Sequence, residues 1–95
     1  MASSISHALI TLSDVDTTLV TIAGTETGTS LTLSIQNVSN TAFVYVGDST
    51  VYDGSYGAVL SPGEVISFDD LSPLSEVYAV SNTNGSKVAV MRVLR

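Results

Sequence analysis

The stretch that decides the fold class runs from residue 31 to residue 36 and reads Leu31-Thr32-Leu33-Ser34-Ile35-Gln36. Apolar and polar side chains alternate strictly along it. In an extended chain the three apolar side chains therefore point to one side and the three polar side chains to the other. This pattern is typical of an antiparallel strand with one buried and one solvated face. It predicts a β-strand over residues 30–38.

Similar short runs of β-forming residues recur along the chain, about every ten to twelve residues, and each ends at Gly, Asn, Asp, Ser or Pro. No stretch has the spacing of a helix. The further runs lie at residues 8–13, 18–23, 42–47, 65–68, 76–81 and 87–94. Together they predict an all-β fold, a single antiparallel β-sandwich of the jelly-roll or Greek-key kind with seven to eight strands. We expect a flexible N-terminal arm at residues 1–7 and one sandwich domain at residues 8–95.

Glycines and a proline mark the expected turns. Pro62-Gly63 fits the two central positions of a type II turn, since Gly accepts the positive φ of the second one. Residues 24–28 form a polar loop bracketed by glycines and predict a hairpin. Asn84-Gly85 predicts a tight hairpin in which residues 76–81 pair with residues 87–94.

The charge balance excludes some partners. The 95 residues have a formal net charge of −6, with Lys87, Arg92 and Arg95 as the cations. Nucleic acid and anionic membranes attract clustered Lys and Arg, so we expect neither as a partner. Arg92 and Arg95 lie at the C-terminus, where they form either a solvated chain end or a contact to an acidic groove of a partner. Without cysteine there is no disulfide framework, and the first residues lack the features of a signal peptide.

We expect no enzymatic activity, no cofactor and no metal site. The single histidine, His7, lies in or beside the expected arm, and the sequence contains no nucleophile elbow and no phosphate loop of the Walker type. Pairs of acidic residues such as Asp48 and Asp53 do not follow a calcium-loop pattern. Asp at a turn ordinarily accepts hydrogen bonds from its own backbone.

Two groups of residues are candidates for contact with a partner. Tyr52 and Tyr56 lie in a glycine-rich loop, and tyrosine is favoured at interfaces; alternatively both rings cover the open end of the sandwich. The strands at residues 42–47 and 88–93 are apolar on both sides. We therefore expect Val44 and Val46 to form part of a second apolar face that packs against another subunit.

Four phrases of the chain resemble small proteins encoded among the structural genes of tailed bacteriophages. These are Leu31–Ser39, Val44-Tyr45-Val46-Gly47, Leu60-Ser61-Pro62-Gly63-Glu64 and Val77-Tyr78-Ala79-Val80. The resemblance covers about residues 8–93 and contains no catalytic residues. It implies a virion component, which commonly acts as a homotrimer.

The resemblance and the apolar strands together favour a capsid decoration, or cement, protein. Such a protein binds the assembled lattice of the major capsid protein on the outside of the virion and is made in the cytoplasm of the bacterial host. The alternative is a small fibre or host-adsorption module that recognises a surface glycan or receptor.

Overall fold

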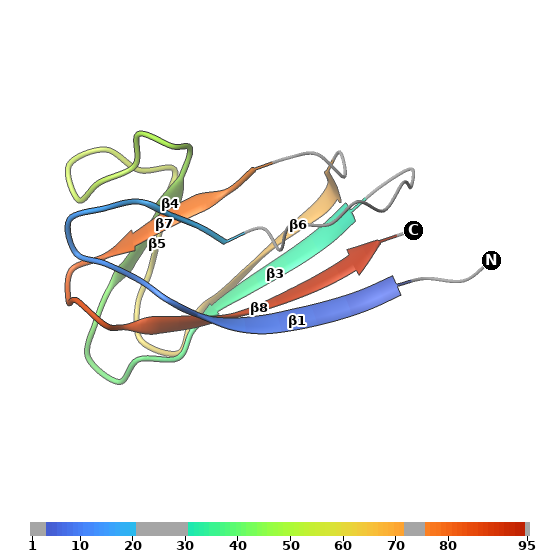
Figure 1. Ribbon diagram of the computed structural model, residues 1–95, viewed down its shortest axis with the longest axis horizontal. Coiled ribbons are helices and arrows are strands. Elements are labelled where there is room, and N and C mark those ends of the chain that lie inside the picture. The colour runs from blue at the N-terminus through green and yellow to red at the C-terminus, as the bar shows by residue number, and fades with distance from the viewer. Residues whose placement is uncertain (1–3, 21–30, 72–75, 95) are drawn as a thin grey trace.

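The computed structural model describes residues 4–20, 31–71 and 76–94, which form eight strands in two packed antiparallel sheets (Figure 1). The strands are β1 (Ser4–Thr11), β2 (Thr18–Leu19), β3 (Leu31–Asn37), β4 (Val44–Gly47), β5 (Ala58–Leu60), β6 (Val65–Leu71), β7 (Tyr78–Ser81) and β8 (Lys87–Leu94). This confirms the predicted all-β sandwich. The described part of the chain contains no helix long and apolar enough to cross a membrane.

The strand order identifies the topology as a jelly roll. The first sheet has the order β1-β8-β3-β6, and the second sheet has the order β2-β7-β4-β5. Strands β4 and β5 pair as a hairpin, and β3 with β6, β2 with β7 and β1 with β8 continue the same antiparallel ribbon. Rolling up this ribbon places alternate pairs in opposite sheets, which is the eight-stranded jelly-roll arrangement.

The core lies between the two sheets and follows the alternation of β3. Leu31, Leu33 and Ile35 are fully buried, whereas the polar residues between them are not. Leu33 and Ile35 pack with Val44 and Val46 of the second sheet and with Val88 and Val90 of β8. The period of two in the sequence therefore identifies the inner face of the first sheet correctly.

Both glycine turns form, but one of them does not make the expected hairpin. Gly63 has φ 83°, and Glu64 N–H donates to the Ser61 carbonyl at 3.0 Å, which confirms the type II turn. Gly85 has φ 87°, and its turn connects β7 to β8. The predicted pairing of β7 with β8 is wrong, because β7 belongs to the second sheet and β8 to the first. A local turn reverses the chain, but the choice of neighbouring strand depends on pairing between distant segments.

The N-terminal boundary also differs from the expectation. Strand β1 begins at Ser4, and its eight residues pair with β8 from Ser4 opposite Leu94 to Thr11 opposite Lys87. Residues 4–7 therefore belong to the sandwich and not to an arm, because β8 is long enough to supply partners for them. Residues 1–3 and the expected hairpin loop at residues 24–28 lie outside the described residues.

Candidate binding surface

The two valines predicted to contact a partner lie in the core instead. Val44 and Val46 point inward from β4 and pack between the sheets. Their alternates on β4, including Tyr45, point outward and are half-buried. The prediction for Val44 and Val46 is wrong because a strand that is apolar on both sides does not reveal which side faces its own sandwich.

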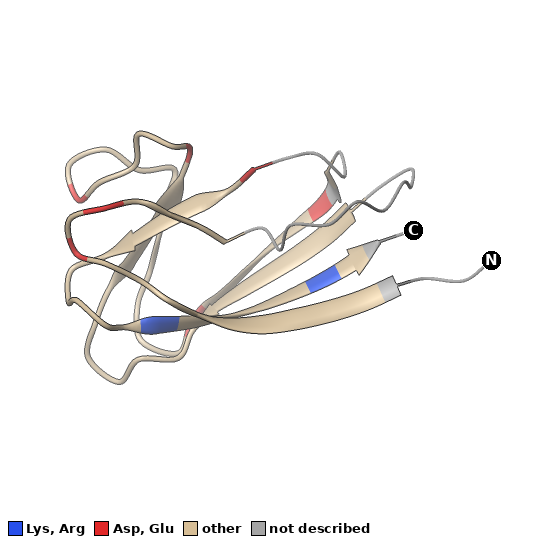
Figure 2. Ribbon diagram, in the orientation of Figure 1, with Lys and Arg blue, Asp and Glu red and all other residues tan. Residues whose placement is uncertain are grey.

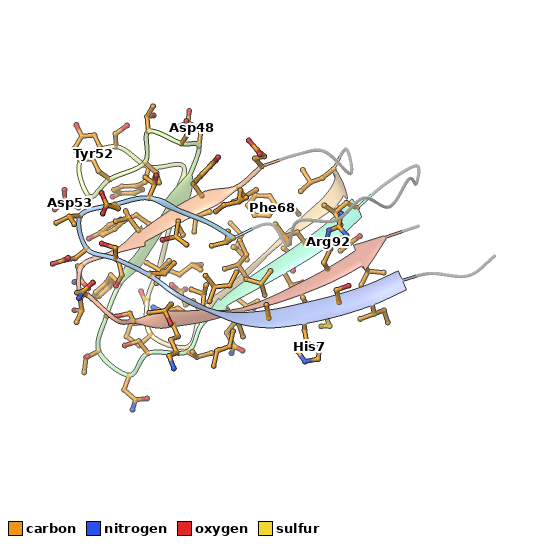
Figure 3. The ribbon with its side chains drawn as sticks, in the orientation of Figure 1. His7, Asp48, Tyr52, Asp53, Phe68 and Arg92 are labelled. Carbon is orange, nitrogen blue, oxygen red and sulfur yellow. The ribbon has the colours of Figure 1, made fainter. Side chains whose placement is uncertain are left out.

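Arg92 is also buried, with 4% of its surface exposed. It continues the period of two that places Val88 and Val90 on the inner side of β8, and its side chain extends between the sheets (Figure 3). The prediction of Arg92 as a surface contact is therefore wrong. Arg95 lies outside the described residues.

Tyr52 and Tyr56 are both exposed, in the loop that joins β4 to β5. The Tyr56 ring packs against Tyr45, with 5.0 Å between the ring centroids, so the loop folds onto the outer side of the second sheet. Tyr52 is held in a tight turn by reciprocal backbone hydrogen bonds with Ser55, at 2.9 and 3.0 Å. It lies at the end of the sandwich opposite the chain termini (Figure 3). The contact role of this pair stays a prediction.

The acidic residues of the same loop serve its local geometry. The Asp48 carboxylate accepts hydrogen bonds from the hydroxyl and the backbone N–H of Thr50. These bonds stabilise the charged form and lower the pKa of Asp48. Within residues 4–20, 31–71 and 76–94 no group of three or more His, Asp or Glu residues is placed to hold a metal ion.

A surface that the sequence only partly indicated lies on the outer side of the first sheet. Four large apolar side chains there, Ile5, Leu9, Val65 and Met91, are between 49% and 68% exposed. The half-buried Ala89 and Val93 lie among them on β8. We call these six residues, Ile5, Leu9, Val65, Ala89, Met91 and Val93, the outer apolar face.

The strand register explains why these residues gather. Across β1 and β8, Ile5 lies opposite Val93 and Leu9 lies opposite Ala89. Their side chains share the outer side because inner and outer positions alternate along both strands. At the other edge of the sheet, Val65 of β6 lies opposite Gln36 of β3. The face thus has residues on β1, β8 and β6, and the polar outward side chains of β3 lie between those of β8 and Val65.

Small uncharged polar residues complete this surface. The Ser34 and Ser67 hydroxyls are hydrogen-bonded to each other at 3.1 Å. A shallow hollow of about 160 Å³ lies beside them, lined by Gln36, Val65 and Met91 among others. Acidic residues are found mainly in the connecting loops, and β1 contains no Asp, Glu, Lys or Arg (Figure 2). The side chains of β3 that lie within the outer apolar face are therefore polar but uncharged.

His7 lies on this outer side as well, on the edge strand β1 and opposite Met91. Its exposed ring projects away from the sandwich (Figure 3). It lies within an edge strand, whereas the sequence predicted it in or beside a flexible arm.

Comparisons with known proteins agree with the fold class. No protein-family model and no curated protein sequence matches this chain. Among solved structures, the chain is similar to a protein from Bacillus endospore appendages, which are described as disulfide-linked pili. The TM-score is 0.53 at 12% identity, and the match covers 98% of this chain and 86% of that chain. The protein is thus a small jelly-roll β-sandwich, a fold that it shares with that appendage protein.

Proposed function

We propose that this protein is a non-enzymatic structural subunit that decorates and cements the capsid of a bacteriophage. In this proposal it binds the lattice of the major capsid protein on the outside of the virion, after synthesis in the host cytoplasm. The observation that carries the proposal is the outer apolar face, a group of exposed apolar side chains on one side of a sheet in a chain of net charge −6. Contiguous exposed apolar surface of this kind is typical of an interaction site.

The energetics favour a multivalent partner such as a lattice. Burying one large apolar side chain contributes roughly 1.5–3 kcal/mol. Association costs roughly 4–15 kcal/mol in lost freedom of motion, so the four side chains of one copy support only weak binding. Several linked copies on a repeating surface bind much more tightly. A subunit that binds only the assembled lattice then stabilises it by mass action.

Two further observations support a structural role. The titratable side chains that the sequence singled out are far apart, with His7 on β1 and Asp48 and Asp53 in the loop at the other end of the sandwich (Figure 3). The similar fold in the Bacillus appendages belongs to a protein described as part of a pilus. Because this sequence contains no cysteine, copies of it are not joined to one another by disulfides.

The proposal predicts that Val65→Lys lowers the affinity for capsids by at least about tenfold, because it places a cation in the outer apolar face. Capsids mixed with the unchanged protein should rupture at a higher temperature than bare capsids. Capsids mixed with the variant at the same concentration should not. The rupture temperature is measured by heating the particles and detecting the released DNA by fluorescence.

Val15→Lys is the matched control, since Val15 is still more exposed but lies in the loop after β1. It should cement as well as the unchanged protein. Equal rupture temperatures with and without the unchanged protein would remove the cement function. Equal loss of binding in both lysine variants would show that the outer apolar face is not the contact.

A fibre or host-adsorption module is the second candidate, favoured by the exposed rings of Tyr52 and Tyr56, of which Tyr52 lines a hollow together with Asp53. Tyrosine rings stack on sugar faces while nearby polar groups bind hydroxyls. If this is the function, a glycan array should show binding that the double variant Tyr52→Ser, Tyr56→Ser abolishes and Val65→Lys leaves unchanged. An array without any bound glycan would argue against this candidate.

A further inference from the structure

The four edge strands of the two sheets differ in how well they are protected. An edge strand presents unpaired backbone N–H and C=O groups, which can pair with another chain unless the strand is short, bulged or charged. Strands β2 and β5 have two and three residues. Strand β6 contains Asp69 and has an irregular register with β3 between Leu31 and Leu33. Each of these three edges therefore has a feature that discourages pairing.

Strand β1 has none of these features. It is eight residues long, contains no proline and no charged residue, and keeps one regular register with β8. Among the described strands its neighbour is β8 alone, so its other side forms the edge of the first sheet (Figure 1). A long, regular and uncharged edge of this kind is a template for strand addition.

The hydrogen bonds at the end of β1 show which residues face this edge. Leu12 N–H donates to the Ser86 carbonyl at 2.7 Å, toward the side of β8. Backbone groups alternate in direction along a strand, so those of Ile10, Ala8 and Ser6 also face β8. The N–H and C=O groups of Ile5, His7, Leu9 and Thr11 therefore point outward from the edge.

We propose that β1 pairs antiparallel with β1 of a second copy of this chain, around a two-fold axis perpendicular to the first sheet. With the axis at His7, Ile5 of each copy lies opposite Leu9 of the other. The two apolar pairs and the outward backbone groups then match, the contact contains no Asp, Glu, Lys or Arg, and each His7 lies opposite the His7 of the other copy at the axis. Self-complementarity of this kind is what an isologous interface requires.

The charge distribution identifies a second copy as the occupant. Two chains of net charge −6 repel each other over most of their surfaces, and β1 is a long edge where no acidic residue lies at the contact. In an antiparallel arrangement about a two-fold axis, the β1 edge of each copy pairs with the β1 edge of the other, and neither edge is left for a third copy. This arrangement therefore produces a dimer and neither a filament nor the trimer that the sequence resemblance implied.

The dimer strengthens the capsid-binding role, and this part of the inference rests on the proposed function. A two-fold axis perpendicular to the sheet leaves the outer apolar faces of both copies on the same side. One continuous eight-stranded sheet then presents both faces to the lattice, and linked copies bind with higher avidity than single ones. Dimer formation itself does not depend on the presence of capsids.

Light scattering after size-exclusion chromatography tests the dimer. At about 100 µM, a concentration suited to an interface smaller than the standard size, we expect a mass twice the 9.8 kDa of the chain. His7→Pro removes an outward N–H without breaking a bond to β8, so it should weaken dimerisation at least tenfold while leaving the dilute protein folded. Leu9→Lys, which places a cation opposite Ile5, should do the same and serves if the proline variant fails to fold.

Val65→Lys is the control, because Val65 lies on β6 at the opposite edge of the sheet. It should remain a dimer even though it loses capsid binding, so failure of the dimer and failure of the capsid function are separate outcomes. Hydrogen exchange should also slow at His7 and Leu9 as the concentration rises. A monomer or trimer at about 100 µM, or variants that dimerise normally, would overturn the proposal.

Discussion

Replacing Asn37 with Ala is expected to lower the free energy of unfolding by about 3 kcal/mol, the loss of several buried hydrogen bonds. Asn37 is fully buried at the end of β3. Its side-chain N–H groups donate to the Ala42 carbonyl at 2.8 Å and to the Leu60 carbonyl at 3.0 Å. Its side-chain oxygen accepts from Ser39 N–H at 3.0 Å. In the alanine variant the Ala42 carbonyl, the Leu60 carbonyl and the Ser39 N–H each lose their hydrogen bond to the side chain of residue 37.

Thermal unfolding followed by circular dichroism measures this loss. A change of about 3 kcal/mol corresponds to a fall in Tm of roughly 12–24 °C for a domain of this size. Asn40→Ala is the matched control, since Asn40 is exposed in the same connection between β3 and β4. It should change the stability by less than about 0.5 kcal/mol. Similar small losses in both variants would show that the buried amide does not organise this end of the sandwich.

The importance of Asn37 extends to the surface proposed for binding. Its backbone N–H donates to the Glu64 carbonyl at 2.9 Å, and its carbonyl accepts from Gly63 N–H at 2.9 Å. Asn37 thus ties the end of β3 to the turn immediately before Val65, a residue of the outer apolar face. Alanine keeps these two backbone bonds but loses the side-chain bond to the Leu60 carbonyl, at the start of the same connection, and should weaken capsid binding through the position of Val65.

Leu33→Ala is expected to lower the free energy of unfolding by about 3 kcal/mol, within the range for buried leucines. Leu33 is fully buried in the middle of β3, which pairs with both β6 and β8. Removal of its side chain leaves a cavity. Because β3 is hydrogen-bonded to β6 on one side and to β8 on the other, the strand cannot shift to close this cavity. Urea unfolding measures the loss, with an unchanged m-value if the unfolded state is unaffected.

Leu9→Ala is the control for Leu33, because it is the same substitution in the same sheet at a side chain that is 60% exposed. In dilute protein, where copies do not associate, it should cost less than about 0.5 kcal/mol. An equal cost at both positions would mean that Leu9 is buried within a single copy, and this would contradict its assignment to the outer apolar face.

The local features of the fold were predictable from residue patterns. The alternation at Leu31, Leu33 and Ile35 identified the buried side of β3, because the side-chain period of a strand is two. Pro62-Gly63 predicted its turn because only the second of these residues adopts a positive φ easily. Each inference depends on a few neighbouring residues, whose geometry is the same in any fold.

The errors concern choices between surfaces or between strands. In β4 the valines and the aromatic residues occupy opposite sides and both are apolar, so local pattern alone does not decide which side is inside. The sequence predicts Arg92 as a surface contact because arginine is charged. Its register with β1 and β3 instead places it on the inner side of β8. The sequence predicts residues 4–7 as an arm, because nothing within these residues shows that β8 is long enough to pair with them.

The amino-acid sequence by itself thus determined an acidic, β-rich sandwich with its turns and one buried face, since period, propensity and turn chemistry act over a few residues. The tertiary structure alone decided that β7 and β8 belong to different sheets, that Asn37 is buried, and that β1 forms an open edge. These outcomes depend on pairing between segments up to 90 residues apart, such as Ser4 and Leu94. Only the rolled-up chain brings such segments together, and with them the surface and the edge on which the proposed assembly depends.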